Sequence, residues 1–233
     1  MPTDPRAPRS RRERPAKPAL TRPGIIATAV RLMRAEGLER VTMRRLAAEL
    51  DTGPASLYVY VRNTAELHAA VLDEMLGVVD LAPVDASGDW QDRLVQLLTS
   101  YTMVLYDNPG LGQSALVARP SGPGYLNLLE AILALLNEGN VPDDRAAWLC
   151  DVLLQFATAN AAEHATRDRD TAAEQDTDAL VAAIRNASAE NHPRIATLGD
   201  DLLSGPGADR LDWGFHLLIN GALHTPRPTD NNR

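Results

Sequence analysis

The sequence predicts an all-α protein in which a small N-terminal domain of three helices precedes a larger helical bundle. Hydrophobic residues make up 45% of the 233 residues, as in a folded protein, whereas aromatic residues make up only 4%. Apolar residues recur at helical spacing along most of the chain. One short run, residues 57–61, alternates like a strand. No second such run is present to pair with it, and an isolated strand would leave its backbone groups without partners.

The first segment, residues 1–20, is expected to be a disordered basic arm, because it contains five prolines, five arginines and a lysine but no apolar periodicity. From Thr21 the pattern becomes helical. Thr21 is a suitable N-cap for the first helix, and Gly37 ends it as a glycine just past a helix terminus does. Thr42 begins a second, short helix whose apolar positions up to Leu50 share one face.

The third helix is expected over residues 54–61, where the strand-like run lies. Pro54 is tolerated in a first helical turn because its missing N–H would have no partner there. On a helix, Leu57 and Val61 lie one turn apart and pack inward. Two short helices joined by a turn that contains glycine form a helix-turn-helix, whose second helix enters the major groove of DNA.

Helical periodicity continues to the end of the chain and predicts roughly nine or ten helices in total. Those of the bundle are expected at 64–81, 89–106, between 109 and 119, and at 125–136, 142–165, 178–190 and 208–223. Residues 83–89 are expected to be a loop, and residues 166–178 are expected to be a mobile loop or a frayed helix end. The domains are therefore a helix-turn-helix domain over residues 21–66, an all-α body over residues 67–225 and a disordered tail over residues 226–233.

Charge is distributed unevenly along the chain. The formal net charge is −8, but residues 1–67 carry thirteen Lys and Arg against seven Asp and Glu, a net of +6. The remaining 166 residues carry ten against twenty-four, a net of −14. A basic front on an acidic body predicts that only the front binds a polyanion such as DNA.

Several classes of protein are disfavoured. No apolar run approaches the ~20 residues that a membrane-spanning helix needs, and the N-terminus lacks the apolar core of a secretory signal. A cytoplasmic protein with no membrane partner is therefore expected. Cys150 is the one cysteine, which excludes a disulfide framework and a thiolate metal site, and its apolar helix predicts a buried, inert thiol.

No pattern of catalytic or metal-binding residues is recognisable. Glu163 next to His164, and Glu190 two residues before His192, do not share a helix face as paired metal ligands would. The chain also lacks a phosphate-binding glycine loop and a nucleophile in a recognisable motif. We therefore expect no metal, no cofactor and no enzymatic activity.

The N-terminal motifs resemble a known family. Residues 20–76 contain T-R-P-G-I-I-x-x-A-x-x-L-x-x-x-x-G-L-x-x-x-T-M-R-R-L-A-x-x-L and then P-A-S-L-Y-x-Y-V-R-N-x-x-E-L. They resemble the DNA-binding domain of the tetracycline-repressor (TetR) family. Residues 210–221, R-L-D-W-G-F-H-L-L-I-N-G, are similar to the terminal helix of the branch that includes the tetracycline repressors themselves. The resemblance implies a homodimer with a three-helix DNA-binding domain and an all-α core that binds a small effector.

The resemblance also implies which residues contact DNA. At the start of the second helix, Thr42 and Arg44 match family positions that contact DNA. In the third helix, the positions that read bases are occupied by Pro54, Ala55 and Ser56. The positions that bind phosphates are occupied by Tyr58 and Tyr60. Thr64 lies where the family often has a phosphate-binding lysine, and Arg62 or Arg22 is expected to compensate. The chemistry agrees, because hydroxyl groups reach base edges and phosphates while small apolar side chains contact thymine methyl groups. Two roles for the arginine arm stay open: insertion into the minor groove, or non-specific attraction.

A dimer is expected because one short recognition helix reads too few bases, and two copies about 34 Å apart match one turn of DNA. As the resemblance implies, the helices at 142–165 and 208–223 are the candidates for an intersubunit four-helix bundle. The stripe expected at that interface is Leu211, Phe215, Leu218 and Ala222. The effector pocket is expected among inward-leaning polar or aromatic residues of the body, which are His68, Tyr101, Tyr125, Gln155, Phe156 and Asn160.

Together these patterns predict a ligand-responsive transcriptional repressor. A homodimer would bind a palindromic operator in double-stranded DNA, and a small-molecule effector would release it by binding the released form better. Two alternatives stay open. One is a constitutive DNA-binding dimer without an effector, and the other is an all-α enzyme with an accidental helix-turn-helix likeness.

Overall fold

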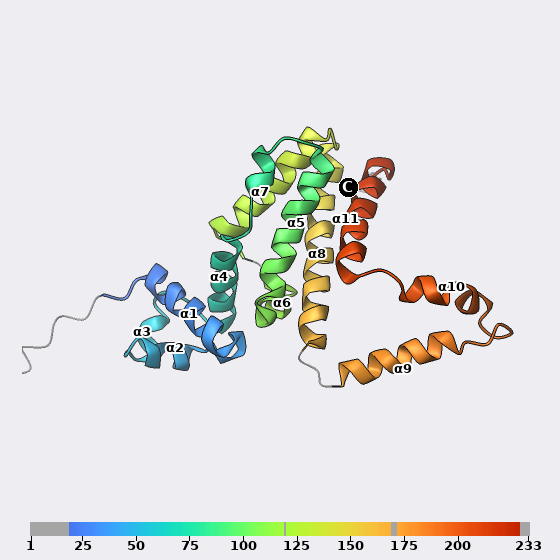
Figure 1. The fold of residues 1–233 in the computed structure, drawn as a ribbon. Helices are drawn as coiled ribbons and strands as arrows, with labels where there is room; N and C mark the ends of the chain where they lie inside the picture. The colour runs from blue at the N-terminus through green and yellow to red at the C-terminus, as the bar shows by residue number, and fades with distance from the viewer. Residues whose placement is uncertain (1–18, 119, 169–171, 229–233) are drawn as a thin grey trace, which may run out of the picture.

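The computed structural model describes residues 19–118, 120–168 and 172–228, and within these ranges every regular element is helical. The all-α prediction is therefore confirmed. The elements are α1 (Arg22–Glu36), η2 (Leu38–Arg40), α2 (Met43–Glu49), α3 (Pro54–Leu57), α4 (Thr64–Leu76), η3 (Ala82–Asp85), α5 (Trp90–Tyr106), α6 (Pro109–Ala115), α7 (Pro123–Glu138), α8 (Asp143–Arg167), α9 (Ala173–Arg185), α10 (Pro193–Leu203) and α11 (Gly207–His224). The elements η2 and η3 are short 3₁₀ turns. Figure 1 shows α1, α2 and α3 as a lobe at one end, beside α4.

Side-chain caps set the boundaries of the first two helices. The Thr21 hydroxyl oxygen accepts a hydrogen bond from the Gly24 N–H at 3.2 Å and begins α1. This helix ends at Gly37, whose φ of 90° lies in the region that favours glycine. The Thr42 hydroxyl oxygen accepts from the Arg45 N–H at 3.1 Å and begins α2. Both caps are those that the sequence predicts.

The third helix is shorter than predicted. It ends at Leu57, and residues 58–60 form a turn in which the Tyr60 N–H donates to the Leu57 carbonyl at 2.9 Å. The prediction of a helix as far as residue 61 is wrong, because aromatic and β-branched residues favour a helix only weakly. The inward and outward positions are nevertheless as predicted, since Leu57 and Val61 are buried while Val59 is 80% exposed.

The helix α4 joins the N-terminal lobe to the body. It begins where the Asn63 side-chain oxygen accepts from the Glu66 N–H at 2.8 Å, and it packs on α1 as well as on α6 and α7. It ends before the predicted residue 81, and η3 replaces part of the predicted loop. This turn is held in place because the buried Arg93 of α5 donates to two of its carbonyl oxygens.

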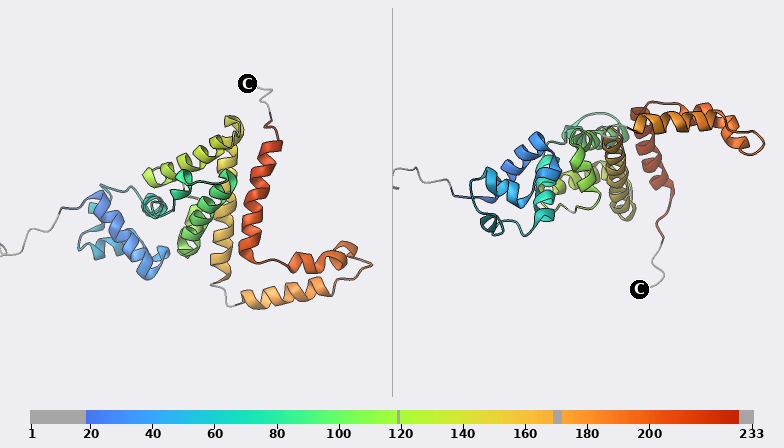
Figure 2. Two further views of the ribbon diagram at one scale, coloured as in Figure 1. Left: turned by 45° about the horizontal axis from the view of Figure 1, so that its top comes forward. Right: turned by 90° about the horizontal axis from the view of Figure 1, so that it is seen from below.

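The core of the body lies between α5, α7 and α8. The helices α5 and α8 run side by side, with α6 and α7 packed against them and α11 on the far side (Figures 1 and 2). Fully buried side chains fill the space between them, including Leu94, Leu97, Leu98, Leu128, Ile132, Leu135 and Leu153. Among the helices of the described ranges, none has the length and hydrophobicity of a membrane-spanning segment.

The segment between α8 and α11 differs most from the prediction. Where a loop is predicted over residues 166–178, α8 continues to Arg167 and α9 begins at Ala173. The helix α9 ends before the predicted residue 190, and α10 is not predicted at all. These two helices lie side by side and project from the body (Figures 1 and 2), and none of their residues is buried. Their apolar residues, which include the exposed Leu180, Leu198 and Leu202, add nothing to the core.

The predictions for the two ends of the chain fall mostly outside the described residues. Residues 1–18 and 229–233, predicted to be disordered, are among those not described. The neighbouring residues make contacts with the folded domains. The Leu20 carbonyl accepts from the Tyr60 hydroxyl at 2.8 Å, and the Arg227 guanidinium lies 4.2 Å from the centre of the Trp148 ring.

Candidate DNA-binding surface and effector cavity

The outer face of α3 and of the turn after it carries residues predicted to read DNA. The two buried residues of this segment fix it on the core of the N-terminal lobe. Residues 54–56 are exposed, and the Tyr58 side chain is 53% exposed. This face offers a serine hydroxyl, a phenol and small apolar groups. Such groups suit base edges, phosphates and thymine methyl groups.

Two neighbouring arginines of α2 have different surroundings. Arg45 donates to the Glu36 carboxylate at 2.6 Å and to the Glu49 carboxylate at 2.9 Å. The hydrogen bond with Glu36 raises the pKa of Arg45 and lowers the pKa of Glu36. Arg44 is exposed, and no carboxylate in the described part of the chain forms an ion pair with it. Arg44 therefore presents an unneutralised charge, as its predicted role requires.

The Tyr60 hydroxyl, which is predicted to bind a phosphate, forms a hydrogen bond within the chain. This hydroxyl donates to the Leu20 carbonyl at 2.8 Å, and the partly buried Tyr60 ring packs against the core. The proton that was expected to reach a phosphate is thus used within the chain, where it ties the segment before α1 to the turn after α3. Tyr58, with its exposed side chain, is the better candidate for a phosphate contact.

The remaining predicted DNA contacts border this face. Thr42 is exposed, and although its oxygen caps α2, its O–H proton is available to an acceptor. Arg62 pairs with Glu66 at 2.9 Å, but its side chain is 86% exposed, so this ion pair contributes little and can exchange for a phosphate. Arg22 lies exposed in the first turn of α1, and Thr64 is half-buried in the first turn of α4.

A cavity of about 440 Å³ lies among α4, α5, α7 and α8, beside the connection between α6 and α7. Its volume is in the range of small-molecule sites. Three of the residues predicted for the effector line it: Tyr101, Tyr125 and Gln155. The Tyr101 and Thr158 hydroxyl oxygens form a hydrogen bond at 2.7 Å. Burial raises the pKa of Tyr101 to about 12, so its phenol stays neutral.

The other three predicted pocket residues do not line this cavity. His68 Nε2 is 2.8 Å from the Val41 carbonyl, so His68 fastens α4 to the segment before α2. Phe156 packs edge-on against Phe215, with ring centres 5.4 Å apart. Asn160 lines a second cavity of about 390 Å³ between α5, α8 and the start of α11. An inward position on a helix predicts burial but not which of several neighbouring spaces the side chain enters.

Sequence reasoning missed two polar residues of the first cavity, Asp151 and Thr158. With Gln155 they stand at positions i, i+4 and i+7 of α8. Residues at this spacing share one helix face. A polar line in a helix that is otherwise rich in alanine and leucine is the signal that could have identified them.

The helix face predicted for the dimer interface is used within the chain. Phe215 is fully buried, and the partly buried residues packed on the same core are Leu211, Leu218 and Ala222. Close packing of α11 on α8 requires Gly214, because a Cβ there would come within 2.4 Å of the Phe156 ring. Within its own subunit, this stripe holds α11 on the body.

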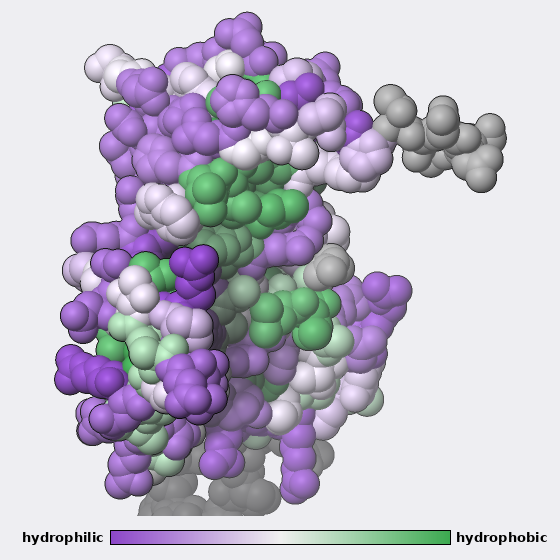
Figure 3. Space-filling view, turned by 90° about the vertical axis from the view of Figure 1, so that its right-hand side faces the viewer, coloured by the Kyte–Doolittle hydropathy of each residue, from purple (hydrophilic) through white to green (hydrophobic). Residues whose placement is uncertain are grey.

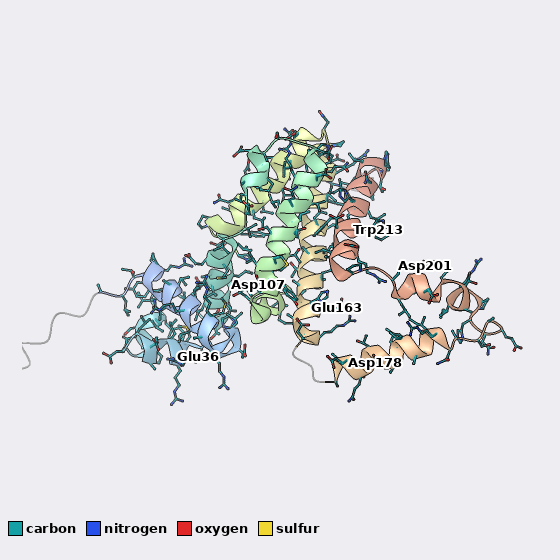
Figure 4. All side chains as sticks on the ribbon, viewed as in Figure 1. Glu36, Asp107, Glu163, Asp178, Asp201 and Trp213 are labelled. Carbon is teal, nitrogen blue, oxygen red and sulfur yellow. The ribbon has the colours of Figure 1, made fainter. Side chains whose placement is uncertain are left out.

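Other apolar side chains of the same two helices are exposed. Trp213 and Leu217 of α11 are 65% and 53% exposed, and Trp148 and Val152 of α8 are 53% and 42% exposed. We call these four residues the outer face of α8 and α11. Figure 4 shows Trp213 on the outer side of α11, and Figure 3 shows hydrophobic surface on the side of the molecule that faces away from α7 and α4. Clusters of exposed apolar residues mark interaction surfaces.

The helix α4 connects the first cavity to the N-terminal lobe. Leu72 and Leu76 line the cavity, and the same helix packs against α1. The Asp73 carboxylate accepts hydrogen bonds from the Tyr125 N–H at 2.9 Å and the Gly124 N–H at 3.4 Å. These bonds fix α4 on the first turn of α7, so displacement of this cavity wall also displaces the support of α1.

A second connection runs through α6. A Cβ on Gly110 would come within 2.8 Å of the Leu38 side chain in η2. A Cβ on Gly112 would come within 3.4 Å of the Ala162 backbone in α8. The helix α6 is therefore packed closely between the body and the N-terminal lobe.

No group of three His, Cys, Asp or Glu side chains in the described ranges is arranged to hold a metal ion. Glu163 pairs with Arg167 at 2.7 Å, and the His164 ring packs edge-on against Tyr106. Burial raises the pKa of the Cys150 thiol to about 12, which makes it unreactive.

Comparison with known proteins relates both parts of the chain to regulators. The family pattern described as "Bacterial regulatory proteins, tetR family" matches residues 25–71, which contain α2 and α3. The pattern described as "Tetracyclin repressor-like, C-terminal domain" matches residues 82–225. The second match covers more than half of the chain and most of the lining of the first cavity.

Individual relatives agree with these matches. The HTH-type transcriptional repressor DrrR1 of Streptomyces coeruleorubidus is 29% identical over 221 residues, which cover 91% of this chain and 80% of the relative. The crystal structure of SCO7704, a proposed transcription regulator from Streptomyces coelicolor, is 55% identical with a TM-score of 0.76, over 91% of this chain and 98% of the other. The TetR family protein ActR of Streptomyces coelicolor, solved in complex with actinorhodin, is 32% identical with a TM-score of 0.79, over 88% and 96% of the two chains.

Proposed function

Because this chain belongs to the tetR family of bacterial regulatory proteins, we propose that it is a homodimeric transcriptional repressor that binds a palindromic operator and is released by a small-molecule effector. One relative, DrrR1, is named a repressor, and another, ActR, was solved with a small molecule bound. The observation that carries the proposal is the double role of α4, which lines the cavity and supports the helix-turn-helix.

A ligand in the cavity acts on DNA binding through α4. It contacts Leu72 and Leu76 and displaces the helix to which α1 is packed. In a dimer, this displacement changes the distance between the two copies of α3, which must match one helical turn of DNA, about 34 Å. The effector lowers operator affinity because it binds the mismatched spacing better than the matched one.

Each copy of α3 contacts one half of the operator. Ser56 hydrogen-bonds to a base edge or a phosphate, and Ala55 contacts a thymine methyl group. Arg44 and Tyr58 bind phosphates on the flanking backbone. Because Pro54 and Ala55 carry no hydrogen-bonding side chain, sequence-dependent DNA shape contributes to recognition. The residues that complete the phosphate contacts are Arg22, Thr42, Arg62 and Thr64.

The dimer forms through the outer face of α8 and α11. Its two tryptophans, its leucine and its valine are the kinds of residue that are buried at the centre of subunit interfaces. A two-fold axis brings the same residues of both copies together, so one exposed cluster serves both sides. Phe215 stays inside each subunit.

Operator binding is tested by fluorescence anisotropy with DNA from upstream of the protein's own gene, at one fixed salt concentration. We expect a dissociation constant of roughly 10⁻⁸ M or lower, and we expect a compound that occupies the cavity to raise it. If the protein binds no palindrome in that region, the proposed repressor function is contradicted. If the DNA is bound but no cavity ligand weakens binding, the constitutive dimer is the better account.

Replacing Arg44 by Ala is expected to lower operator affinity about a hundredfold, because one charge-assisted hydrogen bond to a phosphate, worth about tenfold, is lost in each subunit of the dimer. The slope of the logarithm of the operator affinity against the logarithm of the salt concentration should also decrease in magnitude by about two, because one phosphate contact is lost in each subunit. Arg45→Ala is the matched control, since it removes the same charge from the same helix but from an arginine already held by two carboxylates. Equal losses in the two variants would show that Arg44 acts only through net charge.

A further inference from the structure

One wall of the first cavity is a line of polar side chains on α8. Asp151, Gln155 and Thr158 occupy positions i, i+4 and i+7, so the line extends over about 10 Å of helix. Apolar groups complete the wall and face it, among them Leu154 of α8 and Leu72 and Leu76 of α4. The cavity therefore combines an apolar region with polar groups that are ordered along one direction.

The two ends of this line offer different chemistry. At one end, the Thr158 hydroxyl bonds to the Tyr101 hydroxyl at 2.7 Å, and this bond uses one of the two O–H protons. The other proton is available to an acceptor on a ligand. Both hydroxyl groups are on buried residues, and Tyr101 stays neutral because burial raises the pKa of its phenol. This end suits a carbonyl or hydroxyl oxygen.

The other end carries a negative charge. The Asp151 carboxylate accepts a hydrogen bond from the Gln155 amide, which is neutral and leaves the charge in place. Among the described residues that line the cavity there is no lysine, arginine or histidine. A carboxylate at the edge of a partly apolar cavity attracts a cation and repels an anion. This end suits an ammonium group.

We propose that the effector is a cationic amphiphile about 10 Å long, an inference that rests on the function proposed above. Its ammonium group pairs with Asp151, and an oxygen acceptor at its other end bonds to the Tyr101–Thr158 hydroxyl pair. Its apolar body lies against Leu72 and Leu76. This orientation places the body of the effector on α4, the helix through which it releases DNA.

The charge preference is tested with two probes that share a tricyclic body and two carbonyl oxygens: 2-(aminomethyl)anthraquinone, a cation at pH 7, and anthraquinone-2-carboxylate, an anion. Isothermal titration calorimetry on the full-length protein measures both affinities. The amine is expected to bind at least about tenfold more tightly. Tighter binding of the carboxylate, or no binding of the amine at millimolar concentration, would overturn the proposal.

Asp151→Asn keeps the shape of the side chain and removes its charge. It is expected to lower the affinity for the amine about tenfold and to leave the affinity for neutral 2-methylanthraquinone unchanged. Thr158→Val is expected to weaken the amine and the neutral probe alike, because both lose the same oxygen contact. An Asp151→Asn protein that binds the amine as well as the parent does would remove Asp151 from the site.

Arg119 follows Ala118 and precedes Pro120, two residues of the lining, and it is outside the described residues. The affinities of Arg119→Ala for the amine and for the carboxylate are therefore measured as well. The parent protein could bind the carboxylate probe more tightly than the amine, and Arg119→Ala could lose that preference. This result would show that the site selects anions, and the proposal would fail. In that case a protein that still binds its operator, and is released by the carboxylate, retains the proposed function.

Discussion

Replacing Leu217 by Asp is expected to convert the dimer into monomers and to lower operator affinity at least about a hundredfold. Leu217 is 53% exposed on the outer face of α8 and α11. In a two-fold interface the substitution places two carboxylates against apolar partner surface, and a buried charge without a partner is strongly unfavourable. A monomer carries one copy of α3 and contacts only half of the operator. Sedimentation equilibrium measures the association, and fluorescence anisotropy measures the operator affinity.

Leu126→Asp is the matched control for this experiment. Leu126 lies on α7, is 57% exposed and is not part of the outer face. This variant should remain dimeric and bind operator like the parent. A Leu217→Asp protein that stays dimeric, or a Leu126→Asp protein that dissociates, would place the interface elsewhere on the body.

Replacing Gly124 by Ala is expected to destabilise the protein by roughly 3 kcal/mol, at the upper end for overpacking. A Cβ at this position would come within 2.1 Å of the Asp73 carbonyl oxygen and 3.3 Å of the Gly77 nitrogen. These are backbone atoms, which cannot rotate away as a side chain can. The helices α4 and α7 must therefore separate, and the hydrogen bonds that the Asp73 carboxylate accepts from α7 are lengthened. Thermal unfolding measures the loss, and operator affinity should fall with it because α4 is displaced.

Gly221→Ala serves as the comparison. Gly221 is a helical glycine of α11, and an added Cβ there would meet nothing within 4 Å. Alanine favours a helix over glycine by about 1 kcal/mol, so this variant is expected to be neutral or slightly more stable. If Gly124→Ala is as stable as Gly221→Ala, the contact between α4 and α7 is not the rigid joint described here.

Local signals in the sequence predict the N-terminal lobe well because side chains close in sequence determine it. The hydroxyl groups of Thr21 and Thr42 cap α1 and α2 as expected. The buried pair Leu57 and Val61 is likewise predicted from spacing. The length of α3 is not predicted correctly. Two packing residues are enough to hold this strand-like segment on the core, so the segment does not have to continue as a helix. The role of Tyr60 depends on Leu20, forty residues away, which no local pattern reveals.

The body is harder to predict because its helices are apolar on more than one face. On α11, both the stripe through Phe215 and the face with Trp213 and Leu217 are apolar, and periodicity does not tell which one packs inside the subunit. Residues of α8 show the same ambiguity. Phe156 and Gln155 are adjacent, yet one packs on α11 and the other lines the first cavity. Only the arrangement of the neighbouring helices separates these cases.

The coupling between the cavity and the operator is the central claim, and reciprocal titration tests it most directly. Operator affinity is measured with and without a saturating ligand of the first cavity, and the affinity for that ligand is measured with and without operator. The account predicts that each affinity falls by the same factor, about tenfold or more, because one coupling free energy governs both. A ligand that occupies the cavity beside Leu72 and Leu76 and leaves operator affinity unchanged would contradict it.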